Sequence, residues 1–297
     1  MKLFSIIKII LGTAILLLLL YKAGVKEVAA TITTMNILLL PAIIILFIAG
    51  LYIGAYNIKL LTDALKTKIS MKEMWNYYIL SWAFGMVVPG KIGEFSFVYL
   101  AKKRLTTGQA TAVAVLDKII TVITLCSIAF FGFFIFLPLW TALKLMALAT
   151  IAVAAGLLLL LTPAGRAIAR KLLGKYTAMF AGFSKTLTYL IFEERKAAAM
   201  NLIITFLKWV LTAIVTYLAF LAFGQKISPL VILTISATTM LISLVPITMS
   251  GLGIKEGAAV YLYGLVGVAA ATTISAHIVL LLLNYSGAAA VFFFVKK

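Results

Sequence analysis

Residues 87–100 read VVPGKIGEFSFVYL, and they place a proline, two glycines, a lysine and a glutamate within a strongly apolar part of the chain. Proline and glycine interrupt helices, and charged side chains are costly in hydrocarbon. The chain of 297 residues is 64% hydrophobic and 11% charged, which is far from the composition of a soluble domain. The sequence therefore indicates a membrane protein in which polar and helix-breaking residues interrupt an apolar segment at this stretch.

The apolar residues come in long blocks and do not alternate with polar residues, so they predict membrane-spanning helices and not a transmembrane barrel. A helix needs about 20 residues to cross the hydrocarbon core. Six runs are long enough, at residues 4–21, 37–56, 109–136, 143–161, 198–223 and 268–295. Two further apolar stretches, 73–100 and 229–266, are interrupted by proline and glycine. We predict an all-α polytopic membrane protein.

The net charge of +18 predicts how the chain is oriented, because lysine and arginine accumulate on the cytoplasmic side of membrane helices. The main basic clusters are Lys59, Lys66, Lys68 and Lys72; Lys102, Lys103 and Arg104; Arg166, Arg170, Lys171, Lys175, Lys185, Arg195 and Lys196; and Lys296 and Lys297. If all of them are cytoplasmic, 73–100 enters and returns on that side and 229–266 does so on the outside. Both stretches are then re-entrant hairpins, and both termini are cytoplasmic.

The second hairpin has a tip like the first. Residues 245–263 read VPITMSGLGIKEGAAVYLY, and Glu256 with its neighbours matches Glu94, 162 residues earlier. Paired segments broken by glycine and proline in two halves of opposite orientation are typical of secondary transporters. We predict one transmembrane domain, 1–297, built from an inverted repeat of residues 1–137 and 138–297.

The hairpin tips are the candidate binding site. A tip within the bilayer exposes backbone groups that hydrocarbon cannot satisfy, and helix N-termini at the tips suit an anion such as phosphate. The candidate head-group residues are Lys91, Glu94, Lys255, Glu256, Gly90, Gly93, Gly251 and Gly253. The alternative is structural: each glutamate pairs with the neighbouring lysine or caps backbone N–H groups to hold the turn.

Three other polar residues, Asp117, Lys118 and His277, fall at comparable positions after the two tips and extend a candidate polar path. For His277, a hydrogen-bonded core histidine is the alternative to a proton carrier. The sequence has one histidine, one cysteine and eight acidic residues, and no nucleotide-binding loop or metal-ligand spacing. We therefore expect no catalytic residue, no metal and no cofactor.

The motifs Pro89-Gly-Lys-Ile-Gly-Glu94, Asp117-Lys118 and Gly251-Leu-Gly-Ile-Lys-Glu256-Gly, in this order, resemble those of the lysylphosphatidylglycerol synthase transmembrane region family, the flippase-like integral membrane proteins. In bifunctional members of that family, this domain translocates an aminoacylated phospholipid made by an attached synthase domain. Since the sequence ends at Lys297, we expect the transmembrane part only. The family often has arginine where this sequence has Lys91, Lys118 and Lys255, and lysine binds phosphate as a point charge without the guanidinium fork.

The resemblance and the tips together favour a flippase or scramblase of the cell membrane that moves a phosphate-bearing lipid, either a phospholipid or a polyisoprenyl-phosphate-linked lipid. The alternatives are a secondary transporter of a small solute or ion, a membrane-embedded enzyme acting on a lipid-linked substrate, and a scaffold for a separate enzyme. Anionic or phosphate-bearing membrane lipids are the expected partners, and nucleic acid is not. A homodimer and a separate lipid-modifying enzyme stay open as further partners.

Overall fold

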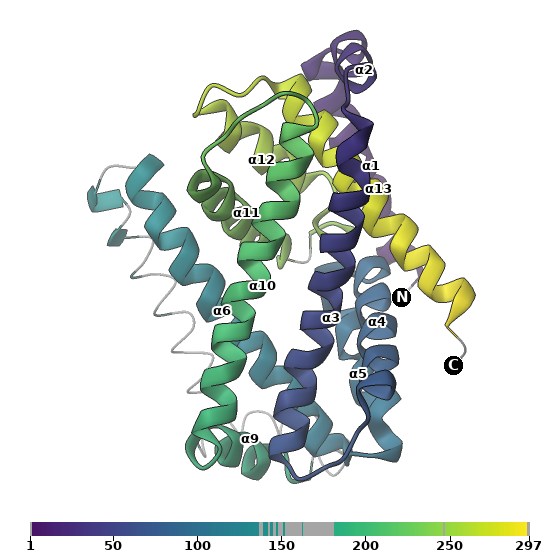
Figure 1. Ribbon diagram of the computed structural model, residues 1–297, viewed down its shortest axis with the longest axis vertical. Coiled ribbons are helices and arrows are strands. Elements are labelled where there is room, and N and C mark those ends of the chain that lie inside the picture. The colour runs from purple at the N-terminus through teal and green to yellow at the C-terminus, as the bar shows by residue number, and fades with distance from the viewer. Residues whose placement is uncertain are drawn as a thin grey trace. The chain divides into compact units, whose positions relative to one another are not determined.

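The computed structural model describes residues 2–136, 139–141, 143–144, 147, 151, 162, 181–245 and 247–295. The elements within these ranges are α1 (Lys2–Ala23), α2 (Val25–Thr33), η1 (Ile37–Leu39), α3 (Leu40–Ala64), α4 (Met71–Val87), η2 (Pro89–Phe95), α5 (Ser96–Leu100), η3 (Ala101–Lys103), α6 (Thr107–Phe136), α9 (Phe183–Phe192), α10 (Arg195–Leu221), α11 (Pro229–Ser243), η5 (Met249–Gly251), α12 (Ile254–Gly264) and α13 (Ala270–Phe294). All of them are helical (Figure 1), and the predicted all-α class is confirmed.

Four stretches of helix are long and apolar enough to cross a membrane: Ile37–Ala64, Thr107–Gly132, Arg195–Leu221 and Ala270–Phe294. The pair Ile7–Ala23 and Val25–Thr33 qualifies as a fifth span if it is counted as one, although it bends by 83° at Gly24. The protein is therefore a multi-pass membrane protein. The predicted span at 143–161 lies largely outside the described residues, so the total of six stays a prediction.

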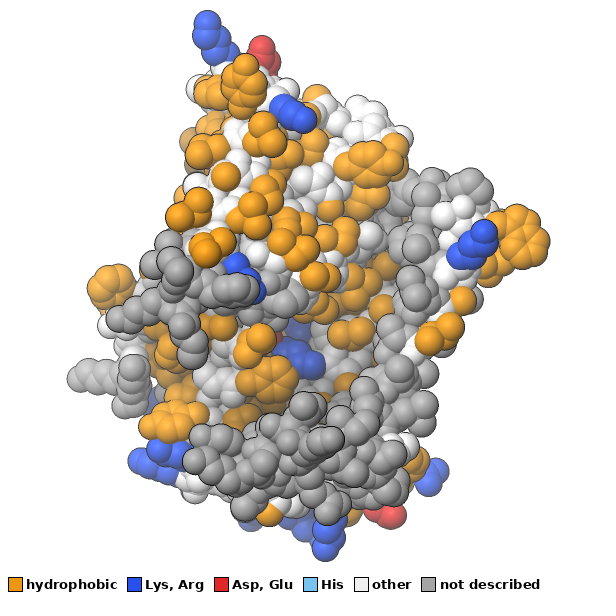
Figure 2. Space-filling model, turned by 180° about the vertical axis from the view of Figure 1, so that it is seen from behind, with side chains coloured by type: hydrophobic (Ala, Val, Ile, Leu, Met, Phe, Trp, Pro, Cys, Tyr) orange, Lys and Arg blue, Asp and Glu red, His pale blue; other side chains and the backbone are white. Residues whose placement is uncertain are grey.

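The surface of these helices is that of a lipid-facing protein. In the most apolar window of Ile37–Ala64, only 11% of the residues are buried within the protein, against 56% in that of Thr107–Gly132. Large side chains such as Leu38 and Phe293, each 86% exposed, would be out of place in water. Figure 2, which views the protein from behind the side seen in Figure 1, shows hydrophobic side chains over much of the described surface. Hydrocarbon is the environment that such a surface requires.

The chain forms two compact units. Unit 1 consists of Met1–Tyr52, Ile79–Glu94 and Leu207–Lys297, and unit 2 of Ile53–Tyr78 and Phe95–Phe206. In unit 1, α13 packs against α1, α2 and α12, and α11 packs against α12. In unit 2, α6 packs against α5 and α9 around buried apolar side chains that include Leu61, Met74, Leu187 and Leu190. Each unit takes residues from both halves of the predicted repeat, and the inverted repeat stays a prediction.

The two predicted hairpins have different arms. The second consists of α11 and α12, which pack on each other, and their 15 and 11 residues give lengths of about 22 and 16 Å. Both are shorter than the hydrocarbon core of about 30 Å, as a re-entrant hairpin requires. In the first, the 17 residues of α4 are followed by η2 and by only five residues of α5. Re-entry into the membrane stays a prediction for both.

Candidate functional site

The first tip, Pro89–Glu94, forms most of η2. Lys91 has a left-handed backbone, with φ of +58°, and its Nζ lies 3.9 Å from Oε1 of Glu94. The two side chains are 20% and 17% exposed. Gly93 lies so close to the carbonyl of Phe84 that a Cβ there would collide with it. The tip therefore folds back on the end of α4, and its glutamate is paired with its lysine.

The second tip, Thr248–Glu256, also turns through left-handed backbone. Ser250, Gly251 and Gly253 have φ of +49°, +79° and +78°. Glu256, which is only 3% exposed, accepts a hydrogen bond at Oε2 from the backbone N–H of Gly253, at 2.7 Å. Since glycine has no side chain, only the glutamate half of a capping box exists here. The carboxylate of Glu256 therefore satisfies one of the free backbone N–H groups at the N-terminus of α12.

Helix α1 covers the second tip. A Cβ on Gly253 would lie 2.5 Å from the carbonyl oxygen of Gly12 and 2.9 Å from Cβ of Ile15. This is a close approach of two backbones that glycine permits. Next to it, Oγ1 of Thr248 and Oγ of Ser250 are buried and have no hydrogen-bond partner among the described residues. Buried polar atoms without partners are rare in native proteins and call for a ligand, water or ion.

His277 lies on α13 in the same unit as both tips. It is 6% exposed, and its Nδ1–H donates to the carbonyl of Thr273 at 2.9 Å. Its ring lies 6.2 Å, between centroids, from each of the rings of Phe220 and Tyr263. These are the contacts of the core histidine that the sequence left as an alternative. Lys91, Glu94, Lys255, Glu256 and His277 thus all belong to unit 1.

Asp117 and Lys118 belong to unit 2, where Asp117 is part of a buried polar layer. Nδ2 of Asn57 donates to Oγ1 of Thr205 at 2.8 Å and lies 3.4 Å from Oδ1 of Asp117. Nδ2 of Asn201 donates to the backbone carbonyl of Asn57 at 3.2 Å. Asp117 is 3% exposed, and Asn57, Asn201 and Thr205 are fully buried. The layer therefore joins α3, α6 and α10 through hydrogen bonds between helices.

Sequence reasoning missed Asn57, Asn201 and Thr205. The available signal was weak: Asn201 and Thr205 are four residues apart, and so they share one face of α10. Lys118 lies at the edge of the layer, with its Nζ 3.5 Å from Oδ2 of Asp117 and its side chain 38% exposed. Among the described residues, the buried Oδ1 atoms of Asn57 and Asn201 have no donor. The layer carries more acceptors than the protein satisfies.

Replacing Asn57 by leucine is expected to destabilise the protein. Asn57→Leu removes the donors to Thr205 and Asp117 and leaves both buried, which costs about 1–2 kcal/mol of the free energy of unfolding. Thermal unfolding in detergent measures the loss. Asn284→Leu is the matched control, because among the described residues Nδ2 of Asn284 donates only to the carbonyl of Leu280 on its own helix. Equal midpoints for the two variants would contradict the role given to the layer.

The amino-acid sequence was compared with those of known protein families and known proteins. Residues 5–291 match the sequence profile of the family described as "Lysylphosphatidylglycerol synthase TM region". A segment of 117 residues is 33% identical to a UPF0104 membrane protein of Methanothermobacter thermautotrophicus. That segment is 38% of this chain and spans about a third, 34%, of the relative's length. The profile match therefore covers nearly the whole chain, whereas the match to this relative covers only part of it.

Proposed function

The chain belongs to the lysylphosphatidylglycerol synthase transmembrane region family, and from this premise we propose that it is a lipid flippase or scramblase of the cell membrane. The motif resemblance noted in the sequence is confirmed by the match over residues 5–291. The proposed substrate is a phosphate-bearing lipid, either a phospholipid or a polyisoprenyl-phosphate-linked lipid. The proposed topology has both termini in the cytoplasm.

The observation that carries the proposal is the second tip, where a buried carboxylate, a lysine and two buried hydroxyls lie close together in the sequence. Glu256 is buried, Oγ1 of Thr248 and Oγ of Ser250 have no partner among the described residues, and Lys255 adds a positive charge. A charged head group cannot cross hydrocarbon without compensating polar groups. The tip supplies such groups in unit 1.

The contacts of Glu256 suggest how a phosphate would bind. Its carboxylate accepts the N–H of Gly253 at the start of α12, which is the kind of donor that also binds phosphate. The two anions would therefore compete for one place. In the proposed mechanism the head group takes the N–H of Gly253 and the charge of Lys255, and the displaced carboxylate of Glu256 takes up a proton or another donor. Glu256 thus keeps the empty site neutral.

The first tip would act in the same way. Lys91 is paired with Glu94 at 3.9 Å, which is longer than a charge-assisted hydrogen bond of about 2.7–2.9 Å. A lipid phosphate between the two tips would draw Lys91 away from Glu94. The proposal needs no covalent chemistry and no cofactor, because the lipid leaves with the same bonds with which it arrived.

Lipid movement is tested directly in proteoliposomes. Lipids labelled on the head group are reconstituted with the protein, and a quencher that cannot cross the membrane reports the fraction in the outer leaflet over time. We expect faster exchange than in empty liposomes for at least one of an anionic phospholipid, a zwitterionic phospholipid and a polyisoprenyl phosphate. Exchange at the empty-liposome rate for all three would overturn the proposal. A change in the mass of a recovered lipid would instead indicate an enzyme.

A further inference from the structure

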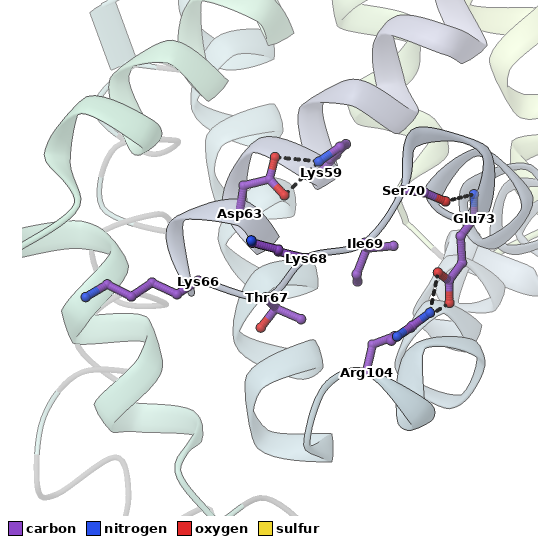
Figure 3. A pocket seen from close by; sticks show the side chains of 9 residues that line it. All are labelled: Lys59, Asp63, Lys66, Thr67, Lys68, Ile69, Ser70, Glu73 and Arg104. Carbon is purple, nitrogen blue, oxygen red and sulfur yellow. Dashed lines mark hydrogen bonds and ion pairs between the residues drawn. The ribbon is translucent and has the colours of Figure 1, made fainter.

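Unit 2 contains another candidate binding site, formed by residues that do not belong to the hairpin tips. It is a pocket of about 800 Å³ formed by the connection between α3 and α4 together with Arg104 (Figure 3). Its charged lining residues are Lys59, Asp63, Lys66, Lys68, Glu73 and Arg104. Its size falls within the range of small-molecule sites, about 300–1,000 Å³. Neither the family match nor the proposed lipid path assigns a role to it.

Both acidic residues of the pocket are already paired. Asp63 accepts from Nζ of Lys59 at 2.7 and 2.6 Å. Glu73 accepts from Nε and Nη2 of Arg104 at 3.0 and 3.1 Å, and this hydrogen-bonded guanidinium lowers the pKa of Glu73. Figure 3 shows the two pairs as separate sets of dashed contacts. Each carboxylate thus lies against one cation of the pocket and offsets its charge.

Lys66 and Lys68 are the two pocket cations whose charges are not offset by Asp63 or Glu73. Within the part of the chain that the structure describes, neither has an acidic partner at ion-pair distance. Both are exposed, and in Figure 3 Lys66 extends away from the other labelled side chains. The hydroxyls of Thr67 and Ser70 line the same pocket. The pocket therefore carries a net charge of about +2, with hydroxyl donors beside it.

The backbone at Lys66 is one that glycine would adopt more easily. Its φ is +58°, and its N–H donates to the carbonyl of Asp63 at 2.8 Å at the end of α3. Helices commonly end in this way with glycine. A lysine in the left-handed region is less favourable by about 1 kcal/mol. The turn alone would be served better by glycine, so it does not account for a lysine at this place.

We propose that this pocket binds a phosphate group with two negative charges, as carried by a phosphomonoester or a diphosphate. A phosphomonoester carries about −1.5 to −2 at neutral pH, which matches the excess charge of Lys66 and Lys68. Lysine ammonium groups and hydroxyls are donors that bind phosphate. The ligand is the head group of a lipid in the adjacent leaflet or a soluble phosphorylated compound, since both present the same chemistry.

Two probes distinguish these sources. Inorganic pyrophosphate is titrated into the purified protein in detergent by calorimetry, and phosphatidic acid in mixed micelles is compared with phosphatidylcholine by native mass spectrometry. Binding of phosphatidic acid but not pyrophosphate indicates the lipid, and binding of pyrophosphate indicates the soluble ligand. Either result supports the site if the pocket variant described next weakens the binding. Failure of the unmodified protein to bind either probe at millimolar concentration overturns the proposal.

The variant Lys66→Gly with Lys68→Gln is expected to weaken binding of the effective probe at least tenfold, because a lost charge-assisted contact costs about a factor of ten or more. It should unfold at no lower temperature, since glycine suits the backbone at position 66. The matched control, Lys72→Gln with Lys103→Gln, removes two charges from exposed positions that do not line the pocket, and should stay within twofold. Equal losses in the two double variants would overturn the site.

The outcome is separable from that of the proposed lipid path. Substitutions at the hairpin tips, Lys91→Gln with Lys255→Gln, leave the residues of the pocket unchanged and should retain phosphate binding there. Loss of pocket binding in the tip variant would contradict an independent site in unit 2. Conversely, if the protein binds pyrophosphate but moves no labelled lipid, the phosphate site is supported and the proposed function is contradicted.

Discussion

Replacing both tip lysines, Lys91→Gln with Lys255→Gln, is expected to reduce lipid translocation in proteoliposomes to the rate of empty liposomes. Each lysine would contribute one charge-assisted contact to the head-group phosphate, which is worth about 1.5–3 kcal/mol. Each single change should therefore slow translocation roughly 10- to 100-fold, and the double change should slow it further. Outer-leaflet quenching of head-group-labelled lipid measures the rates.

The charge itself is tested by the conservative change. Lys91→Arg with Lys255→Arg keeps both cations and adds a fork that binds phosphate, so it should retain most of the rate. Lys226→Gln removes one charge from an exposed position between α10 and α11, and it should leave the rate unchanged. A glutamine variant that translocates as fast as the unmodified protein would show that the tips do not bind the head group.

Replacing Gly253 by alanine is expected to unfold or displace the second tip. The new Cβ would lie 2.5 Å from the carbonyl oxygen of Gly12 and 2.9 Å from Cβ of Ile15, so α1 and the tip must separate. The backbone at φ of +78° adds strain of about 1–2 kcal/mol for any residue other than glycine. We expect a total loss of at least about 3 kcal/mol, together with loss of translocation. Thermal unfolding in detergent reports the first effect.

Gly267→Ala separates the two causes. Gly267 has φ of +81°, and a Cβ there meets no atom within 4 Å. This variant therefore suffers the backbone strain without the collision, and its free energy of unfolding should fall by only about 1–2 kcal/mol. If the two alanine variants unfold at the same temperature, the close packing of α1 on the tip contributes nothing, and the strained backbone explains the whole effect.

The class of the protein was predictable because the bilayer imposes strong constraints on composition. Long apolar runs must be helical in hydrocarbon, and in the structure the predicted runs at 37–56, 109–136 and 198–223 fall on η1 with α3, on α6, and on α10 as far as Leu221. The family was predictable from Pro89–Glu94 and Gly251–Glu256, because these motifs combine rare residue types at fixed spacing. In the structure, these two stretches form η2 and the turn that contains η5.

The contacts of the candidate site were not predictable at the same level. The sequence left open whether the glutamates bind a ligand or hold the turn. The structure shows that Glu256 accepts the N–H of Gly253 and that Glu94 pairs with Lys91, which are the contacts of the structural alternative. Binding of a head group at the tips stays a proposal. The short second arm of the first hairpin, α5 (Ser96–Leu100), lies within the few residues that the predicted bounds of 73–100 leave after Glu94.

Features that depend on residues close together in the chain, such as the helical class and the family motifs, could be predicted from the order of residues alone. Features that depend on pairs far apart in the chain could not. Asn57 forms hydrogen bonds with Asp117 and Thr205, which are 60 and 148 residues away in the chain. The backbone of Gly12 packs against Gly253. Lys59 and Arg104 line the same pocket. Hydrophobic patterns specify which face of a helix is apolar, whereas the partner across that face is selected by packing in three dimensions.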